Sequence, residues 1–94
     1  MDYEHGGDFP GLPMDETRIL VEKIIGLYAA SKPTQTLGSW VLDTFYPNLW
    51  SDNVTIDRDF RYAQRTSDAE TYLRAFINRG RLDPKPLQDA VGGL

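Results

Sequence analysis

Apolar residues recur three and four positions apart in the first third of the chain, which is the spacing of one helix face. The pattern follows Asp15, a good helix N-cap, and comprises Ile19, Leu20, Ile24, Leu27 and Tyr28. A residue before a proline is disfavoured in helical geometry, so we expect the helix to end near Ser31, ahead of Pro33. Val21 and Ile25 widen the apolar stripe, and the helix is therefore expected to be covered on more than one flank.

Two further stretches have the same periodicity. Thr34 or Thr36 is expected to cap a second helix that ends before Pro47, although Gly38 weakens it. Its apolar face comprises Leu37, Trp40, Val41 and Phe45. The capping-box pair Ser67 and Glu70 predicts a third helix, which Gly80 ends and whose apolar face comprises Tyr72, Leu73, Phe76 and Ile77. A short C-terminal helical turn is predicted after Asp83-Pro84, with Leu87, Ala90 and Val91 on one side.

Residues 54 to 62 alternate between apolar and polar side chains, which is the period of a strand. One side carries Val54, Ile56, Phe60 and Tyr62, with Arg58 as an unexpected charge among them. A lone strand must pair with another segment, a second copy or another protein to satisfy its backbone. We therefore predict an α+β, mainly helical fold with three helices, a short C-terminal turn and one short strand region. An all-α small bundle, with residues 54 to 62 irregular or helical, is the alternative.

The chain is expected to form one small domain behind an N-terminal tail. Phe9 and Leu12 stand isolated among the glycines, prolines and acids of residues 1 to 13, so we interpret this stretch as a flexible tail. Residues 14 to 94 are expected to form a single globular domain. Such a small domain is only marginally stable, which leaves a homo-oligomer open.

Charge and composition narrow the choice of partners and location. The net charge of -4 repels polyphosphate, so nucleic acid is not expected as a partner. No apolar run approaches the roughly 18 residues of a membrane span, so no membrane partner is expected either. The absence of cysteine favours a reducing, intracellular and cytoplasmic location for this small acidic protein.

Candidate catalytic chemistry is sparse. His5, the single histidine, lies in the predicted tail, where nothing holds it for proton transfer or metal binding. Asp52, Asp57 and Asp59 lie close in sequence, but Arg58 and Arg61 offer them neutralisation, so we expect a solvated or ion-paired face. The sequence thus predicts no metal site, no cofactor and no enzyme.

The order of elements from Glu16 to Ile77 resembles the first half of the NTF2-like, or SnoaL-like, cone fold. The similarity rests on Leu27-Tyr28, on Phe45-Tyr46-Pro47, on residues 49 to 57 and on the helix from Ser67 to Phe76. The resemblance implies a curved sheet around a pocket, yet residues 78 to 94 contain no strand pattern to complete one. No catalytic residue is carried over from it.

Two functions follow as hypotheses. The first is a non-enzymatic protein-protein interaction module, such as a small adaptor, inhibitor or assembly subunit, that binds another protein or a second copy of itself. Its predicted partner-binding residues are Trp50, Arg58, Phe60, Arg61 and Tyr62. The alternative is a reduced NTF2-like domain that binds or converts a small apolar molecule, with Asp57 or Asp59 as general base.

Overall fold

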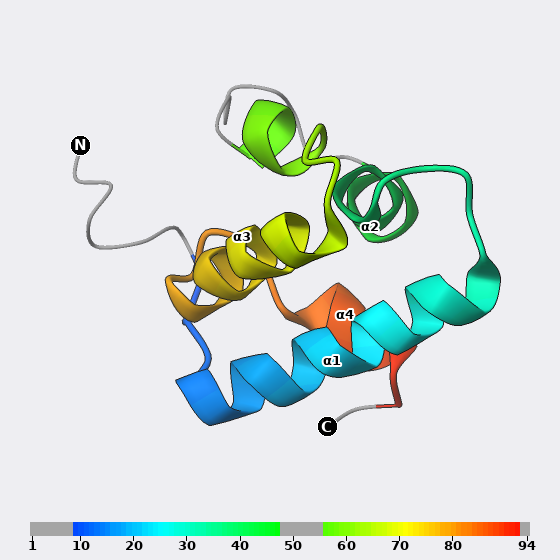
Figure 1. The fold of residues 1–94 in the computed structure, drawn as a ribbon. Coiled ribbons are helices and arrows are strands. Elements are labelled where there is room, and N and C mark those ends of the chain that lie inside the picture. The colour runs from blue at the N-terminus through cyan, green and yellow to red at the C-terminus, as the bar shows by residue number, and fades with distance from the viewer. Residues whose placement is uncertain (1–8, 48–55, 93–94) are drawn as a thin grey trace.

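The computed structural model describes residues 9–47 and 56–92, and in these two ranges the chain forms helices and no strand (Figure 1). The elements are α1 (Met14–Ser31), α2 (Leu37–Phe45), the short π-helical segment η2 (Ile56–Phe60), α3 (Thr66–Asn78) and α4 (Lys85–Ala90). The prediction of a mainly helical fold with three longer helices and a short C-terminal one is confirmed. The arrangement matches the all-α alternative.

The predicted strand is wrong wherever the structure describes it. Residues 56 to 60 are helical, and residues 54 and 55 lie outside the described ranges. In a strand Phe60 and Tyr62 would share a side, yet Phe60 is fully buried and Tyr62 is 64% exposed. The backbone is satisfied locally, because the Tyr62 amide donates to the Arg58 carbonyl (3.3 Å) and the Ala63 amide to the Phe60 carbonyl (3.4 Å). A short alternating pattern does not distinguish a strand from a helix anchored by one large side chain.

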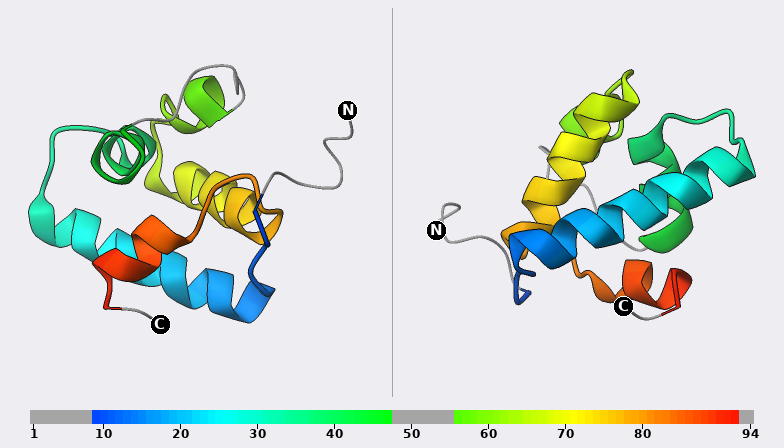
Figure 2. Two further views of the ribbon diagram at one scale, coloured as in Figure 1. Left: turned by 180° about the vertical axis from the view of Figure 1, so that it is seen from behind. Right: turned by 60° about the horizontal axis from the view of Figure 1, so that its bottom comes forward.

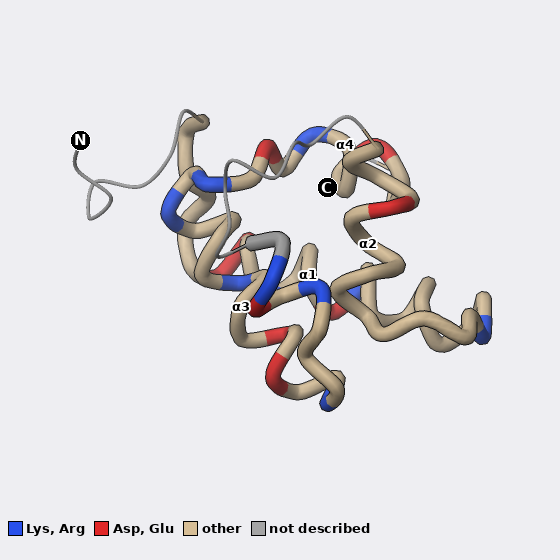
Figure 3. Tube along the Cα trace, turned by 90° about the horizontal axis from the view of Figure 1, so that it is seen from above, with Lys and Arg blue, Asp and Glu red and all other residues tan. Residues whose placement is uncertain are grey.

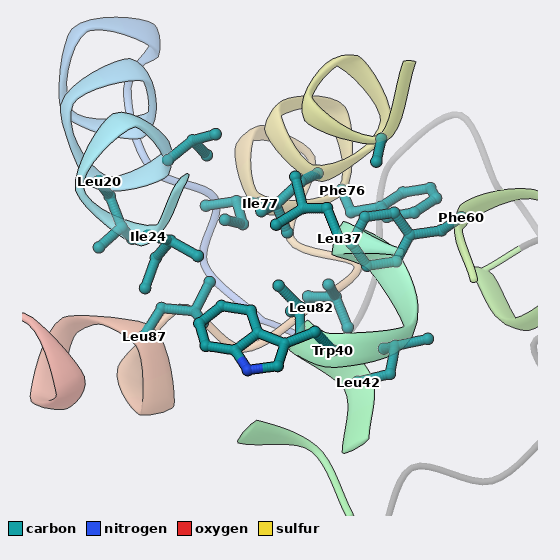
Figure 4. Close-up of a cluster of buried hydrophobic side chains, with 14 residues drawn as sticks. Leu20, Ile24, Leu37, Trp40, Leu42, Phe60, Phe76, Ile77, Leu82 and Leu87 are labelled. Carbon is teal, nitrogen blue, oxygen red and sulfur yellow. The ribbon is translucent and has the colours of Figure 1, made fainter. Parts of the chain in front are cut away.

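The core lies where four helices and η2 meet. α1 packs beside α3 and α4, while α2 packs against α1 and α3 (Figures 1 and 2). η2 lies against α3 and inserts Phe60, whose ring meets that of Phe76 edge-on at 5.7 Å (Figure 4). The labelled core side chains include Leu20, Ile24, Leu37, Trp40, Leu42, Ile77, Leu82 and Leu87. All but Trp40 among these eight are at most 1% exposed, so every element contributes to one continuous interior.

α1 buries a narrower stripe than its sequence suggests. Its buried residues are Thr17, Leu20, Val21 and Ile24. Ile19 and Leu27 are 42% and 36% exposed, because α2, α3 and α4 all pack on the other side of the helix. The prediction that Ile19 and Leu27 belong to the apolar face is therefore wrong, whereas Val21, which was expected to widen that face, is fully buried.

Most predicted helix ends are confirmed. α1 ends at Ser31, and the Thr36 hydroxyl caps α2 by accepting a hydrogen bond from the Ser39 amide at 3.3 Å. Gly80 follows α3 with φ +74°, and the Arg81 amide donates to the Phe76 carbonyl at 2.7 Å in a Schellman arrangement. The predicted capping box is wrong, because α3 begins at Thr66 and Ser67 lies inside it.

The predicted flexible tail, residues 1 to 13, is described from Phe9 onward. Residues 9 to 13, which we call the N-terminal strap, run across the end of α3 (Figure 2). The Phe9 amide donates to the Gly80 carbonyl (3.1 Å), and the Asn78 side-chain amide donates to the Leu12 carbonyl (2.8 Å). Leu12 packs against the core. These described residues of the tail therefore belong to the packed domain.

Candidate functional site

The chain turns sharply after η2, and α2 holds this turn in place. We call residues 58 to 63 the Tyr62 turn. The Thr36 hydroxyl donates to the Arg61 carbonyl at 2.7 Å, while Nη1 of Arg61 donates to Oδ1 of Asp43 at 2.9 Å. One main-chain and one side-chain contact thus join the same residue of the turn to α2.

Asp43 connects the Tyr62 turn to a wider polar group. Its second oxygen, Oδ2, accepts a hydrogen bond from Nε2 of Gln35 at 2.7 Å, and Nε2 also contacts the Ser39 hydroxyl at 3.2 Å. The hydrogen bond from Arg61 is the main cause that holds the pKa of Asp43 below its ordinary value, and burial opposes it. The carboxylate is therefore ionised at neutral pH and retains Arg61.

Phe60 is the internal anchor of the turn. Its side chain is fully buried, and its ring lies beside Leu37 and Phe76 (Figure 4). It therefore cannot contact a partner, and its assignment as a partner-binding residue is wrong. The physical reason is that a phenylalanine ring gains more from the helical interior than from a half-exposed strand position.

Arg58 and Tyr62 form the exposed part of the turn. Tyr62 is 64% exposed, and the Arg58 side chain is 72% exposed. Nε of Arg58 lies 3.7 Å from Oδ1 of Asp59, a distance at which an exposed ion pair contributes little. The Arg61 side chain is only 23% exposed, which is less than Arg58 or Tyr62. Trp50 lies outside the described residues, so its role stays a prediction.

Sequence reasoning missed the residues of α2 that support the turn. Asp43 lies 18 positions before Arg61, and Thr36 lies 25 positions before it. No local spacing relates positions so far apart. Tyr72, which was predicted to lie on the apolar face of the third helix, stacks on Phe76 with ring centroids 6.1 Å apart and is 37% exposed. It therefore extends the Phe60–Phe76 contact to the surface of α3.

The described residues do not bring the candidate catalytic and metal-binding side chains together into a site. His5 and the Asp57 side chain lie outside what the structure describes, and Asp59 is a half-exposed partner of Arg58. In the described ranges no three His, Cys, Asp or Glu side chains are grouped for a metal ion. No helix in these ranges has both the length and the hydropathy to cross a membrane. The geometry here offers contact surface and hydrogen bonds.

Comparisons with protein-family models, with curated proteins and with solved structures found no match. The resemblance to the NTF2-like cone fold stays a prediction, and no strand in the described ranges adds to it.

Proposed function

We propose that this chain is a protein-binding module that contacts its partner through the Tyr62 turn. The observation that carries the proposal is the exposure of Tyr62. Tyr62 is 64% exposed, more than any other large hydrophobic side chain that the structure describes. Tyrosine and arginine are enriched at the centres of protein interfaces, because each provides apolar area together with hydrogen-bonding groups.

Because the backbone around Tyr62 is already held in place, binding through this side chain loses little conformational entropy. Phe60 is buried two positions earlier, and Arg61, the residue between them, is bonded to Thr36 and Asp43. A side chain on a backbone that is already ordered loses less conformational freedom when it binds. The turn therefore presents its aromatic ring in a defined position before a partner arrives.

Arg58 and Arg61 give the surface its polar selectivity. The Arg58 guanidinium is exposed and only weakly paired, so it is available to a carboxylate or a main-chain carbonyl of the partner. Arg61 is engaged by Asp43 and acts mainly by shaping the turn. We therefore expect Tyr62 and Arg58 to contribute most of the binding energy.

Quantitative affinity capture followed by mass spectrometry tests the proposal. The immobilised wild-type chain is compared with the double variant Tyr62→Ala/Arg58→Ala, using extract of the native source. Loss of a central interface residue costs about 2 kcal/mol or more, which corresponds to a Kd at least roughly 30-fold weaker. Partners that bind through the turn should be depleted accordingly.

Ile19→Ala is the matched control, because it removes an exposed apolar side chain, 42% exposed, from α1. It should leave capture unchanged. Sedimentation of each purified chain alone shows whether the partner is a second copy. If the double variant keeps its helical circular dichroism and captures the same proteins in the same amounts, the Tyr62 turn is not the binding surface.

A further inference from the structure

The segment from Arg58 to Ser67, which runs from η2 into α3, is basic within a chain whose net charge is -4. It holds three arginines and one acid, Asp59. Elsewhere on the described helices basic and acidic positions are interspersed (Figure 3). This local excess of positive charge attracts an anionic group even though the protein as a whole is acidic.

The three arginines of this segment differ in how far the fold already engages them. The Arg61 side chain is held by α2 through an ion pair of 2.9 Å. Arg58 has a looser pair, in which its Nε lies 3.7 Å from Oδ1 of Asp59, and its side chain is 72% exposed. Arg65, the exposed N-cap of α3, makes no side-chain hydrogen bond or ion pair with the residues that the structure describes. Two guanidinium groups are therefore open to an external anionic group.

These two arginines lie close to Tyr62. The Tyr62 amide donates to the Arg58 carbonyl at 3.3 Å, so the two residues are one helical turn apart. Consecutive Cα atoms are about 3.8 Å apart, so the Cα atom of Arg65 lies within about 11 Å of that of Tyr62. An exposed aromatic ring thus lies near two open cations, one before it and one after it in the sequence.

From this arrangement, and on the basis of the function proposed above for the Tyr62 turn, we propose that the partner presents an acidic peptide segment. An apolar residue of that segment packs on the Tyr62 ring, while Asp or Glu residues on either side of it pair with Arg58 and Arg65. A guanidinium can form two parallel hydrogen bonds with one carboxylate, which adds geometric selectivity to the attraction.

Nucleic acid fits this surface less well than a peptide does. Its phosphates form a dense array of negative charge, whereas Asp59 lies among the arginines of the segment. The net charge of -4 also repels a long polyanion, while a short acidic segment on another protein needs to approach only the turn.

Selection from a random dodecapeptide library displayed on phage tests this partner chemistry on the immobilised full chain. Selected peptides are sorted by whether Tyr62→Ala abolishes their binding. Those that depend on Tyr62 should be enriched in Asp and Glu beside an apolar residue. Tyr62-dependent peptides without an excess of acids would leave the turn as a binding surface but overturn its acidic partner. A selection without any Tyr62-dependent peptide overturns the inference, while the affinity capture described above judges the turn separately.

The two arginines are then tested with one selected acidic peptide, labelled for fluorescence anisotropy. Arg58→Gln/Arg65→Gln should weaken its Kd about 2- to 30-fold, the range expected for the loss of two exposed ion pairs. Sodium chloride at about 0.5 M should weaken wild-type binding by a similar factor and affect the variant less.

The matched control, Lys23→Gln/Arg79→Gln, removes two exposed cations from α1 and from the end of α3. It should leave the Kd unchanged, and unaltered circular dichroism confirms the fold of both variants. Equal weakening by the two double variants would assign binding to overall charge and overturn the proposal. Tighter binding of a single-stranded oligothymidine of similar length, weakened by the Arg58 and Arg65 variant, would overturn it in favour of nucleic acid.

Discussion

Gly38 of α2 lies against the carbonyl group of Phe60, so closely that a Cβ at position 38 would come within 2.0 Å of the oxygen. The absence of a side chain at this position lets the backbone of the Tyr62 turn rest directly on α2. A glycine inside a helix destabilises that helix, but at position 38 it permits the contact that places Phe60 in the core. The same close approach brings Arg61 within reach of Thr36 and Asp43.

Gly38→Ala should therefore destabilise the protein, even though alanine favours helices. Backbone atoms cannot yield to the added methyl group without moving η2 from α2, and such overpacking costs about 1–3 kcal/mol. Gly26→Ala is the control. Apart from its own neighbouring helix backbone, no atom lies within 4 Å of a Cβ at position 26, so the variant should gain about 0.5–1 kcal/mol. Urea unfolding monitored by circular dichroism measures both changes, and a stabilising Gly38→Ala would contradict the close contact.

Truncation of Phe60 and of Tyr62 should have very different effects on stability. Phe60→Ala empties a fully buried site and should cost about 3–5 kcal/mol. Tyr62→Ala removes an exposed ring and should change the free energy of unfolding by no more than about 0.5 kcal/mol. Comparable losses in denaturant unfolding would indicate that both rings share one buried face, as the strand would have placed them.

Protonation of Asp43 should lower the stability of the protein at acidic pH. Because Arg61 lowers the pKa of Asp43 in the folded state, the resulting stability is present at neutral pH and is lost as the pH falls through that lowered pKa. Asp43→Asn should be less stable than the wild type at pH 7 by about 0.2–1 kcal/mol, the range for an exposed pair. The difference should shrink as the pH falls below 3.8, the ordinary value for aspartate. Unfolding curves from pH 7 to pH 2 measure it, and a constant difference would exclude this ionisation as the cause.

Ionisation of Tyr46 should lower the stability of the protein at alkaline pH. Its hydroxyl donates to the Asp83 carbonyl at 2.6 Å, and burial, with a smaller effect of the Asp83 charge, raises its pKa. The folded state then keeps a proton that the unfolded chain releases, so stability present below pH 10.0, the ordinary value, is lost as the pH rises further. Tyr46→Phe should cost about 1 kcal/mol at pH 7 by leaving the carbonyl unpaired.

Above pH 10 the wild type should lose stability faster than the Tyr46→Phe variant, so the two unfolding curves converge. Tyr62→Phe, at an exposed position, is the control and should follow the wild type throughout. Parallel loss of stability in the wild type and in Tyr46→Phe would show that another group is responsible.

Helix boundaries were predictable because the signals that set them are local. Pro33 stops α1 near Ser31 through the geometry of the preceding residues, and Gly80 ends α3 because glycine accepts a positive φ. The Thr36 cap likewise depends on an amide only three positions away. Each of these features is decided within a few residues of chain.

The candidate site could be predicted only in part. Arg58 and Tyr62 were predicted as partner-binding residues, and both side chains are exposed in the structure. Phe60 was misplaced because an alternating run of nine residues has no unique period, and the contact with Gly38 that decides its position is not visible in the local pattern. The Asp43 partner of Arg61 was missed for a similar reason, since 18 residues separate them.

The sequence by itself therefore determined where α1, α2 and α3 form and that their apolar residues build one core, because backbone preferences and periodicity act over short distances. Only the tertiary structure decided that residues 56 to 60 are helical, that Ile19 faces outward while Leu20 is buried, and that the strap joins α3. Those outcomes depend on which surfaces meet, and a surface is buried only when distant segments supply the atoms that cover it.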